Sequence, residues 1–540
     1  GPALGMQRGW RELSPPTPQA AFPQQFNFEL SGGKCPVYAM DFAREVLGRI
    51  QVTFDAPAGT TLIFTASERL MPDSSVQTGF QLTRLQHRVV AKGGRQTWVA
   101  MHPFGFRFLE LMVLQDSGTV RIESVDTVRI KAPYSETGRF LCSDASLNQI
   151  WQLCRETQVS SLEDAYIDCP WRERGLYTGD QIIQFYLNLA LFGDHTMMRR
   201  CVNLFYQGQD ESGLLPPCSH GLPNWRHPDY AALSVESLWH YWARTGDVAF
   251  VMEKADALER LLEALDAMRE PAHGLVDGEG RIPYVDMSQV DRGGVSFALN
   301  AMICGAFQFG ADLLQLAGKA EAAAKWQTLH TEQKARLRET FLREGLFLDR
   351  RPEELEAPKP SGLGNVLAVY YGIAETAEIA GCIDFAITCA RTNQTVPEPK
   401  QSFDFHFSAY SSFYLLEVLY RHNQGAEAER YIRREWRRML DGGAWTCWEY
   451  FVPSHSLCHA WAASPGWFLS SKVLGLDYVE PGNPNRLRFA PHTGSLEWAE
   501  GSFPHPTGAI HVSWQQTANG PAAEIVAPSG LAIVDAGGNE

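Results

Sequence analysis

Short stretches in which hydrophobic and polar residues alternate dominate the first quarter of the chain. Residues 50–54, 61–64 and 106–113 show this two-residue period, and Pro, Gly and Asp separate them. Such a period puts alternate side chains on opposite faces of a strand, which is typical of antiparallel sheets. We therefore predict an N-terminal antiparallel β-sandwich at 26–137, after a Pro- and Gln-rich stretch at 1–25 that we expect to be disordered or tag-derived.

The hydrophobic period becomes helical near Asp144. Leu147, Ile150, Trp151 and Cys154 follow this capping residue at helical spacing. Helical patterns then recur to about residue 474. They predict eleven helices, at 144–163, 180–206, 229–245, 248–270, 294–317, 319–342, 363–380, 383–392, 403–422, 425–440 and 456–474.

Many of these predicted helices form pairs joined by short turns, such as 245–247 and 317–319. Pairs with longer loops between them favour a ring of helical hairpins, and an (α/α)6 barrel would need one helix more than the pattern shows. A solenoid fits less well, because ankyrin and TPR repeat signatures are absent from the sequence. We predict a multidomain fold: the N-terminal sandwich, an (α/α)6 barrel catalytic domain at 138–478, and a small C-terminal β-domain at 479–540, where short strands return after Pro481.

Composition restricts the class of protein. The chain has 540 residues of which 45% are hydrophobic, enough for several domains with large cores. The net charge is −15 and we find no block of Lys and Arg, so neither nucleic acid nor an anionic membrane is an expected partner. We also find no run of about eighteen apolar residues that would span a bilayer. A small-molecule ligand remains, and a homodimer stays open.

The eleven cysteines show no CxxC pair and no regular framework. They are expected to be buried thiols of a reducing compartment, which favours a cytoplasmic location. The first six residues read as an expression scar, so a leader removed in cloning would instead make the protein secreted or periplasmic. His220, His455 and His459 lack a metal-ligand spacing such as HExxH, and we expect no metal and no cofactor.

Residues 168–180 are unusually rich in charge. The segment Asp-Cys-Pro-Trp-Arg-Glu-Arg-Gly-Leu-Tyr-Thr-Gly-Asp contains three carboxylates and two arginines. Crowded carboxylates raise one another's pKa, which active sites use to keep a proton donor protonated. Glu173 is the candidate donor, and in an extended loop Arg172 and Arg174 would point away from it and brace the loop. The structural alternative, that Asp180 caps a helix, explains Asp180 alone.

Three further loops combine aromatic rings with a carboxylate or an imidazole. They are 220–230 with Trp225 and Asp229, 442–450 with Trp445, Trp448 and Glu449, and 454–461 with His459. This mixture is expected where the apolar face of a sugar stacks on a ring while its hydroxyls are bound at the edge.

Glu449 is the residue of these loops that a structural role explains least. A carboxylate among rings loses hydration, which favours catalysis over a buried salt bridge. Trp445 and Trp448 fit the core and a binding site equally well. His459 fits either a hydroxyl-binding imidazole or a core histidine, mostly neutral at pH 7.

These motifs resemble those of bacterial α-L-rhamnosidases of glycoside hydrolase family 78. The most specific are Asp-Cys-Pro-Trp-Arg-Glu-Arg at 168–174 followed by Tyr-Thr-Gly-Asp at 177–180, Trp-Thr-Cys-Trp-Glu at 445–449, and Ser-Leu-Cys-His-Ala-Trp at 456–461. The resemblance extends from the β-sandwich to the C-terminal strands. It implies a catalytic (α/α)6 barrel flanked by β-domains that hydrolyses terminal α-L-rhamnosides with inversion.

By position, the resemblance implies that Glu173 is the general acid and Glu449 the general base. An inverting pair predicts a carboxyl separation of about 6.5–9.5 Å. The remaining predicted site residues bind the substrate: Asp168, Arg172, Tyr177, Asp180, Trp225, Asp229, Trp445, Trp448 and His459. The chain departs from the commoner family pattern at Trp171 and Trp445, two bulky side chains that would narrow the pocket or reshape the aglycone subsite.

Other functions remain as alternatives. A polysaccharide lyase also uses a helical toroid, but two catalytic glutamates are not what it requires, and the negative charge of the chain would repel polyuronates. A sugar-binding protein without catalysis, and a glycosidase for another sugar, are the remaining alternatives.

Overall fold

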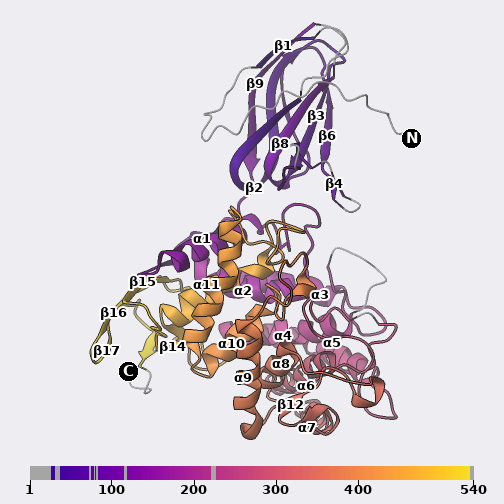
Figure 1. The fold of residues 1–540 in the computed structure, drawn as a ribbon, viewed down its shortest axis with the longest axis vertical. Coiled ribbons are helices and arrows are strands. Elements are labelled where there is room, and N and C mark those ends of the chain that lie inside the picture. The colour runs from indigo at the N-terminus through magenta and orange to yellow at the C-terminus, as the bar shows by residue number, and fades with distance from the viewer. Residues whose placement is uncertain are drawn as a thin grey trace.

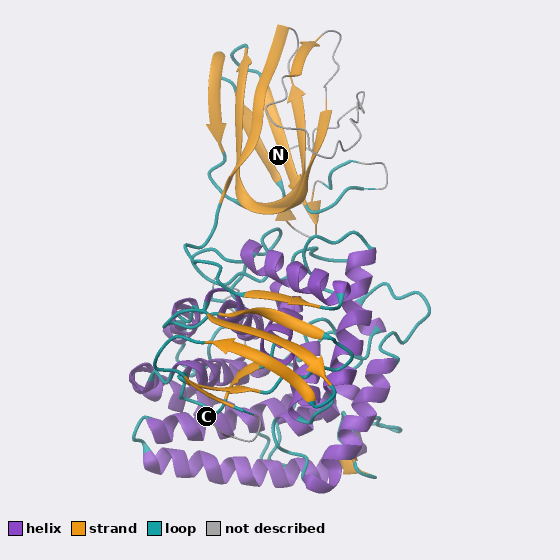
Figure 2. Ribbon diagram, turned by 90° about the vertical axis from the view of Figure 1, so that its left-hand side faces the viewer, coloured by secondary structure: helices purple, strands orange, loops and turns teal. Residues whose placement is uncertain are grey.

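The structure of the protein is a computed structural model that describes residues 26–30, 37–71, 75–77, 79–80, 83–114, 118–219, 227–281 and 283–535. An all-β N-terminal part sits at one end of a larger helical body (Figure 1). A second group of strands lies against the side of that body (Figure 2).

The N-terminal strands belong to one connected sheet in the order β1-β9-β2-β8-β3-β6, with β7 also paired to β2. Their bounds are β1 (Phe26–Leu30), β2 (Val37–Ala56), β3 (Thr61–Ser67), β6 (Gln86–Val90), β7 (Gly94–Val99), β8 (Phe104–Leu114) and β9 (Gly118–Arg129), beside a hairpin of β4 (Gly79–Phe80) and β5 (Thr83–Arg84).

Strand β2 converts this sheet into two layers. Its first part pairs with β8, whereas its second part pairs with β9 on one edge and β7 on the other. The register shifts between Asp41 and Val46, where Ala43 has a φ of +62°, so the strand bends there. Side chains of both layers, among them Phe54, Phe64 and Phe106, fill one core. The predicted antiparallel sandwich is confirmed.

The helical body contains twelve α-helices within the described residues. They are α1 (Ala145–Ser160), α2 (Thr178–Phe192), α3 (Thr196–Gln207), α4 (Pro228–Thr245), α5 (Val248–Asp266), α6 (Phe297–Leu316), α7 (Ala320–Phe341), α8 (Gly362–Tyr370), α9 (Thr376–Arg391), α10 (Ser412–Arg421), α11 (Gly425–Asp441) and α12 (Ser464–Phe468). The count matches the predicted six-hairpin barrel.

The twelfth helix lies inside the segment that the sequence analysis took as one helix, 180–206. Helix α2 ends at Gly193, whose φ of +65° stops the helix. Asp194 then accepts hydrogen bonds from the backbone N–H groups of Thr196 and Met197 and starts α3. Other predicted bounds were wrong as well. The helix predicted at 363–380 ends at Tyr370, and α9 begins at Thr376 instead of 383. Helix α10 begins at Ser412 instead of 403, and the last predicted helix is divided into a 3₁₀ turn (Ala460–Ala463), α12 and a π-helical turn (Leu469–Val473).

Helix α6 is apolar and long enough to cross a membrane by length and composition alone, with a mean hydropathy of 1.4 over its most apolar window. No segment of this kind was expected from the sequence. In the fold, 83% of that window is buried inside the protein, where α4, α5, α7 and α8 pack around the helix. A core helix of a barrel accounts for its composition.

The strands outside the sandwich form three small sheets. β10 (Arg139–Cys142), β15 (Trp498–Phe503), β16 (Ile510–Thr517) and β17 (Gly520–Val526) make one, β13 (Leu476–Tyr478), β14 (Arg486–Phe489) and β18 (Ala532–Val534) another, and β11 (Leu342–Arg343) and β12 (Leu346–Phe347) a hairpin after α7. The boundary predicted at 138 groups β10 with the barrel, whereas β10 pairs with β15, which follows the barrel.

The sandwich docks directly on the segment that contains Glu173. The backbone N–H of Gly105 donates to the carbonyl of Pro170 at 2.6 Å, and Arg174 donates to the carbonyl of Pro103 at 2.9 Å. A Cβ at position 105 would lie 2.3 Å from Pro170, so only glycine allows this approach.

Candidate active site

A cavity of about 430 Å³ collects side chains from loops that are far apart in the sequence. Its walls come from the segment before α2, the start of α2, the segments on either side of the start of α4, the loop before α6, and the loop between α11 and α12. The lining residues are Asp168, Arg172, Glu173, Tyr177, Asp180, Pro217, Cys218, His227, Tyr230, Tyr284, Met287, Glu449, Tyr450, His455, His459 and Trp461.

Two aspartates and a histidine meet deep in this cavity. Asp168 Oδ1 accepts a hydrogen bond from the N–H of Gly175 at 2.7 Å, while its Oδ2 lies 3.6 Å from His459 Nε2. Asp180, in the first turn of α2, places Oδ1 3.5 Å from His459 Nδ1. Among the described residues, Asp168 Oδ2, Asp180 Oδ1 and His459 Nδ1 have no hydrogen-bond partner. These three atoms are buried next to one another and keep unused hydrogen-bonding capacity.

Burial changes the ionisation of all three groups. It raises the pKa of Asp168 to about 6. Burial, with repulsion from Asp168 and Glu449, raises the pKa of Asp180 well above its usual value and favours its neutral form. Burial lowers the pKa of His459 to about 3, so this imidazole is neutral at pH 7. The cluster thus offers both donors and acceptors to a polyhydroxylated ligand.

One guanidinium lies between the two glutamates of the site. Arg172 donates from one terminal nitrogen to Glu449 Oε2 at 2.8 Å, and the other terminal nitrogen contacts Glu173 Oε1. Tyr177 donates its hydroxyl to Glu173 Oε2 at 2.8 Å. The expectation that Arg172 points away from Glu173 was wrong, because residues 170–173 form a turn and Arg174 has a φ of +56°, so side chains do not alternate. Arg174 does brace the loop, through Glu163.

Glu449 is ionised at neutral pH although its side chain is only 4% exposed. Burial pushes the pKa of Glu449 upward, but interactions with His459, Arg172 and the N–H of Ser456 outweigh burial and hold that pKa below its usual value. Because His459 is neutral at pH 7, the compensating charge at that pH comes from Arg172. The residue is suited to accept a proton.

Aromatic rings form the apolar part of the cavity. The Trp461 ring lies 4.1 Å from His459, 6.1 Å from Tyr284 and 6.3 Å from Tyr450, centroid to centroid, and Tyr230 packs edge-on against Tyr284. The sequence analysis noted the loops of Trp461, Tyr450 and Tyr230 without assigning these rings to the site. It missed Tyr284, although an aromatic residue two positions before a carboxylate, Asp286, was the same signal that marked the other loops.

Seven of the predicted site residues line the cavity together, namely Asp168, Arg172, Glu173, Tyr177, Asp180, Glu449 and His459. Asp229 does not. It is buried beneath the cavity wall, where its Oδ2 accepts a hydrogen bond from the N–H of Val285 at 2.5 Å. Val285 has a φ of +51°, so Asp229 holds the unusual backbone turn that presents Tyr284. Trp225 lies outside the described residues.

Two of the predicted tryptophans, Trp445 and Trp448, do not line this cavity. Trp448 is buried against Gly442 and faces the junction with the sandwich. Trp171 is also buried outside the cavity, with the Arg69 guanidinium 5.9 Å from its ring centroid. Ring type and loop position do not reveal on which side of a loop a side chain lies.

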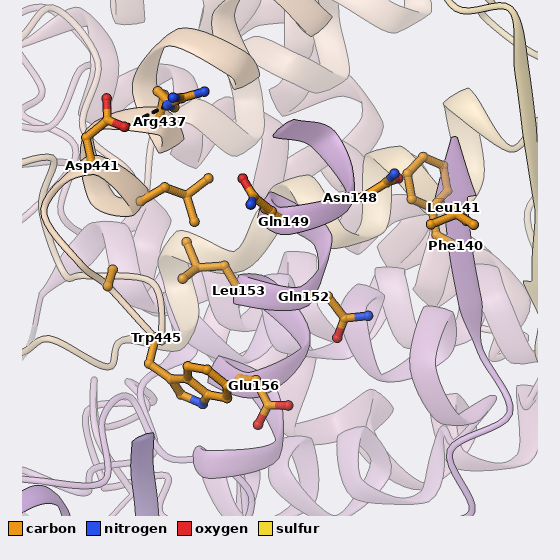
Figure 3. Close-up of a pocket in the computed structure, with 12 residues that line it drawn as sticks. Phe140, Leu141, Asn148, Gln149, Gln152, Leu153, Glu156, Arg437, Asp441 and Trp445 are labelled. Carbon is orange, nitrogen blue, oxygen red and sulfur yellow. Dashed lines mark hydrogen bonds and ion pairs between the residues drawn. The ribbon is translucent and has the colours of Figure 1, made fainter. Parts of the chain in front are cut away.

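Trp445 is 43% exposed and lies in a surface groove of about 630 Å³ (Figure 3). Glu156 stands beside Trp445 at one end of the groove, and the ion pair of Arg437 and Asp441, 2.7 Å long, at the other. Glu156 contacts Arg155, so both carboxylates of the groove are paired with arginines. The groove is larger than the cavity, but it offers no equivalent of the glutamate pair.

No group of three or more His, Cys, Asp or Glu side chains suited to a metal ion occurs in the part of the chain that the structure describes. The ten cysteines in the described part of the chain are all buried.

Two family models match the chain. Residues 135–473 match the bacterial alpha-L-rhamnosidase 6 hairpin glycosidase domain, and residues 34–131 match the bacterial alpha-L-rhamnosidase concanavalin-like domain. The first match alone includes more than half of the chain.

Individual relatives agree. An alpha-L-rhamnosidase of Alteromonas sp. (strain LOR) is 21% identical over 90% of this chain and 54% of its own length. A GH78 rhamnosidase of Bacillus sp. GL1 superposes with a TM-score of 0.84 and 26% identity, over 96% of this chain and 55% of that protein. A rhamnosidase of Klebsiella oxytoca, solved with rhamnose bound, has a TM-score of 0.68 and 20% identity, over 82% of this chain and 88% of that protein. The chain thus spans about half the length of the Alteromonas and Bacillus proteins.

Proposed function

Because the chain belongs to the bacterial α-L-rhamnosidases of glycoside hydrolase family 78, we propose that it removes terminal α-L-rhamnose from glycosides or oligosaccharides. The cavity supports this proposal with its combination of acidic groups, a neutral imidazole and aromatic rings. Rhamnose in the Klebsiella oxytoca relative supports a sugar ligand of the same kind here.

The observation that carries the proposal is that Glu173 and Glu449 contact the two terminal nitrogens of the single Arg172 guanidinium. Glycoside hydrolysis needs two carboxyl groups on either side of the scissile bond. No other pair of glutamates lines this cavity among the described residues. We assign Glu173 as the general acid and Glu449 as the general base.

An inverting reaction fits this arrangement. Both glutamates contact Arg172. The facing carboxylate oxygens of Glu173 and Glu449 are therefore separated by at most two hydrogen-bond lengths, of about 2.9 Å each, plus the width of one guanidinium. This upper limit admits both the roughly 6.5–9.5 Å of an inverting pair and the roughly 5–5.5 Å of a retaining pair, so the proposal of inversion rests on the family resemblance. Glu449, held ionised by Arg172, would take a proton from that water while it attacks the anomeric carbon.

Glu173 has to carry a proton when it acts on the leaving group. Its side chain is one-third exposed, and in the free protein it contacts Arg172 and Tyr177. We propose that a substrate entering the cavity separates Glu173 from the Arg172 guanidinium, so that Arg172 then pairs with Glu449 alone. The protonated Glu173 then donates to the glycosidic oxygen as the bond breaks, and the sugar is released with the opposite anomeric configuration.

Binding of the sugar falls to the rest of the cavity. Asp168, Asp180 and His459, which line the cavity and keep unused hydrogen-bonding capacity, would hold hydroxyl groups, and Trp461 and Tyr284 would contact the apolar face of the ring. These side chains come from three separate loops, so the sugar would be held from several sides.

The test uses Glu173→Gln and Glu449→Gln, with Glu163→Gln as the control, since Glu163 pairs with Arg174 outside the cavity. On an oligosaccharide ending in α-L-rhamnose, Glu173→Gln should lose on the order of 10²–10⁴ in kcat, because the leaving group needs a proton. On a nitrophenyl rhamnoside that loss should shrink, whereas the Glu449→Gln loss should not.

NMR of the first-formed product gives the stereochemistry, and the inverted anomer is expected. A retained anomer, or a Glu173→Gln variant as active as wild type on the oligosaccharide, would contradict the assignments. Binding of rhamnosides without release of rhamnose would contradict hydrolysis itself.

A further inference from the structure

Two residues of the N-terminal sandwich reach across to the loop behind Glu449. Glu68 Oε2 accepts a hydrogen bond from the backbone N–H of Leu457, and Arg69 donates to the carbonyl of Pro453 at 2.8 Å. Both lie directly after β3, so the sheet fixes where they emerge. The sandwich therefore holds this loop by its backbone at two points.

The held loop is also the one that surrounds the proposed base. The N–H of Ser456 donates to Glu449 Oε2 at 3.0 Å, and the carbonyl of Ser456 accepts from the N–H of Glu449 at 2.9 Å. The hydroxyl of Ser456 accepts from Arg172 Nε at 3.0 Å. Ser456 thus sets the positions of both Glu449 and the arginine that ionises it, and Leu457 is its immediate neighbour.

Glu68 is buried at this junction, an unfavourable environment for a carboxyl group. It is 3% exposed, in a cavity of about 350 Å³ between sandwich and barrel, and its other oxygen has no hydrogen-bond partner among the described residues. A buried carboxyl costs free energy that an apolar side chain would not. Burial raises the pKa of Glu68 to about 8, so at pH 7 the group is mostly neutral and serves Leu457 as a plain oxygen acceptor.

We infer that Glu68 is a positioning residue, through which the N-terminal sandwich holds Glu449 in its working place by way of Leu457 and Ser456. The inference rests on the proposed function for the role of Glu449. On this inference the sandwich is part of the catalytic unit. It contributes no side chain to the lining of the cavity, but it determines the position of Glu449.

The experiment compares three variants of the whole chain. Glu68→Met removes the acceptor and keeps the volume, whereas Glu68→Gln keeps an acceptor oxygen. Glu45→Met is the matched control, because Glu45 is equally buried and lines the same junction, and the structure records no bond from it to this loop among the described residues. The readouts are amide hydrogen exchange of the 449–459 peptide and the kinetics of rhamnoside hydrolysis.

For Glu68→Met we expect faster exchange of the 449–459 peptide and a kcat lower by about tenfold to a hundredfold, as a small misplacement of a catalytic group causes. KM should change less than about twofold, since sugar contacts are untouched. Glu68→Gln should restore both readouts and Glu45→Met should leave them as in wild type. Unchanged exchange and kcat in Glu68→Met would overturn the inference.

Two further arrangements keep the test decisive. Should Glu68→Met fail to fold, Arg69→Met cuts the second tether instead, and unchanged exchange there would overturn the inference equally. Exchange alone decides whether the sandwich holds the loop, so the result stands even if rhamnoside hydrolysis is not observed. A protein without hydrolysis but with faster exchange in Glu68→Met would remove the proposed function and keep the tether.

Discussion

Replacing Arg172 by Met should turn Glu449, the proposed general base, from a group that is ionised at neutral pH into one that is ionised only at higher pH. The two side chains form a buried ion pair, 5% and 4% exposed, with the nitrogen and oxygen 2.8 Å apart. In wild type His459, this pairing with Arg172 and the N–H of Ser456 together outweigh burial and keep the pKa of Glu449 below its usual value. In the variant only burial, which raises the pKa, and weaker hydrogen bonds remain.

The size of the effect follows from the cost of an unpaired buried charge. Removing one partner of a buried ion pair costs about 3–5 kcal/mol. An unpaired charge at this site favours the protonated form, so the pKa of Glu449 should rise above its usual value. The acid limb of kcat should move upward in pH with it, because Glu449 must be ionised to accept a proton.

The contribution of Glu449 to the free energy of unfolding should depend on pH in opposite directions in wild type and in Arg172→Met. In wild type the lowered pKa of Glu449 stabilises the fold above the pKa of the unfolded chain, and this is lost as the pH falls through the folded value. In Arg172→Met the raised pKa favours the protonated fold at low pH and costs stability as the pH rises. The deficit in the free energy of unfolding should therefore be about 3–5 kcal/mol at pH 7 and shrink toward pH 4.

The assay is kcat against pH on a nitrophenyl α-L-rhamnoside, whose leaving group hardly needs Glu173, together with urea unfolding at pH 7 and pH 4. Arg174→Met is the control, since Arg174 pairs with Glu163 at the sandwich side. An acid limb of Arg172→Met that coincides with that of wild type would refute the view that this arginine ionises the base.

Three further outcomes are expected. Asp229→Ala removes the acceptor of the Val285 N–H, so urea unfolding should show a loss of about 1–3 kcal/mol, and KM should rise more than kcat falls as Tyr284 shifts; an unchanged KM would contradict this link. Trp445→Ala should leave kcat/KM on a small rhamnoside unchanged and unfolding within about 0.5 kcal/mol, because the ring is exposed outside the cavity; a tenfold loss in initial rates would restore it as a substrate contact. Dialysis against EDTA should leave kcat unchanged, since the described residues hold no metal-type cluster, and a loss reversed by added metal would be the contrary result.

The site residues that could be predicted are carboxylates whose sequence neighbours make a purely structural role unfavourable. Asp168, Glu173 and Glu449 lie among rings and like charges, an arrangement that costs stability unless the groups are used, and all three line the cavity. The six-hairpin ring could be predicted because helical spacing persists over most of the middle of the chain. The prediction lacked one helix because Gly193 ends α2 within a segment that is apolar on both sides of this glycine.

The rest depended on which way a loop turns. Asp229 was predicted as a ligand-binding residue, yet its carboxylate closes a backbone turn. Trp448 faces the sandwich, while its neighbour Glu449 faces the cavity. Arg172 was expected to point away from Glu173 because side chains alternate along an extended backbone. Residues 170–173 form a turn instead, and a turn does not show this alternation. Contacts between domains, such as Glu68 with Leu457, leave no periodic mark in a sequence.

Strand β10 has a consequence for how the molecule is made. It precedes the first barrel helix, yet its partner β15 lies near the other end of the chain, and the hydroxyl of Ser502 donates to the carbonyl of Thr137 across 365 positions. A chain on the ribosome lacks that partner until Trp498–Phe503 has been translated, so β10 keeps an unpaired edge until then. Pairings so distant in sequence also form slowly. The pairing of β10 with β15 should therefore follow synthesis of the barrel helices, and until it forms the nascent protein depends on protection from self-association.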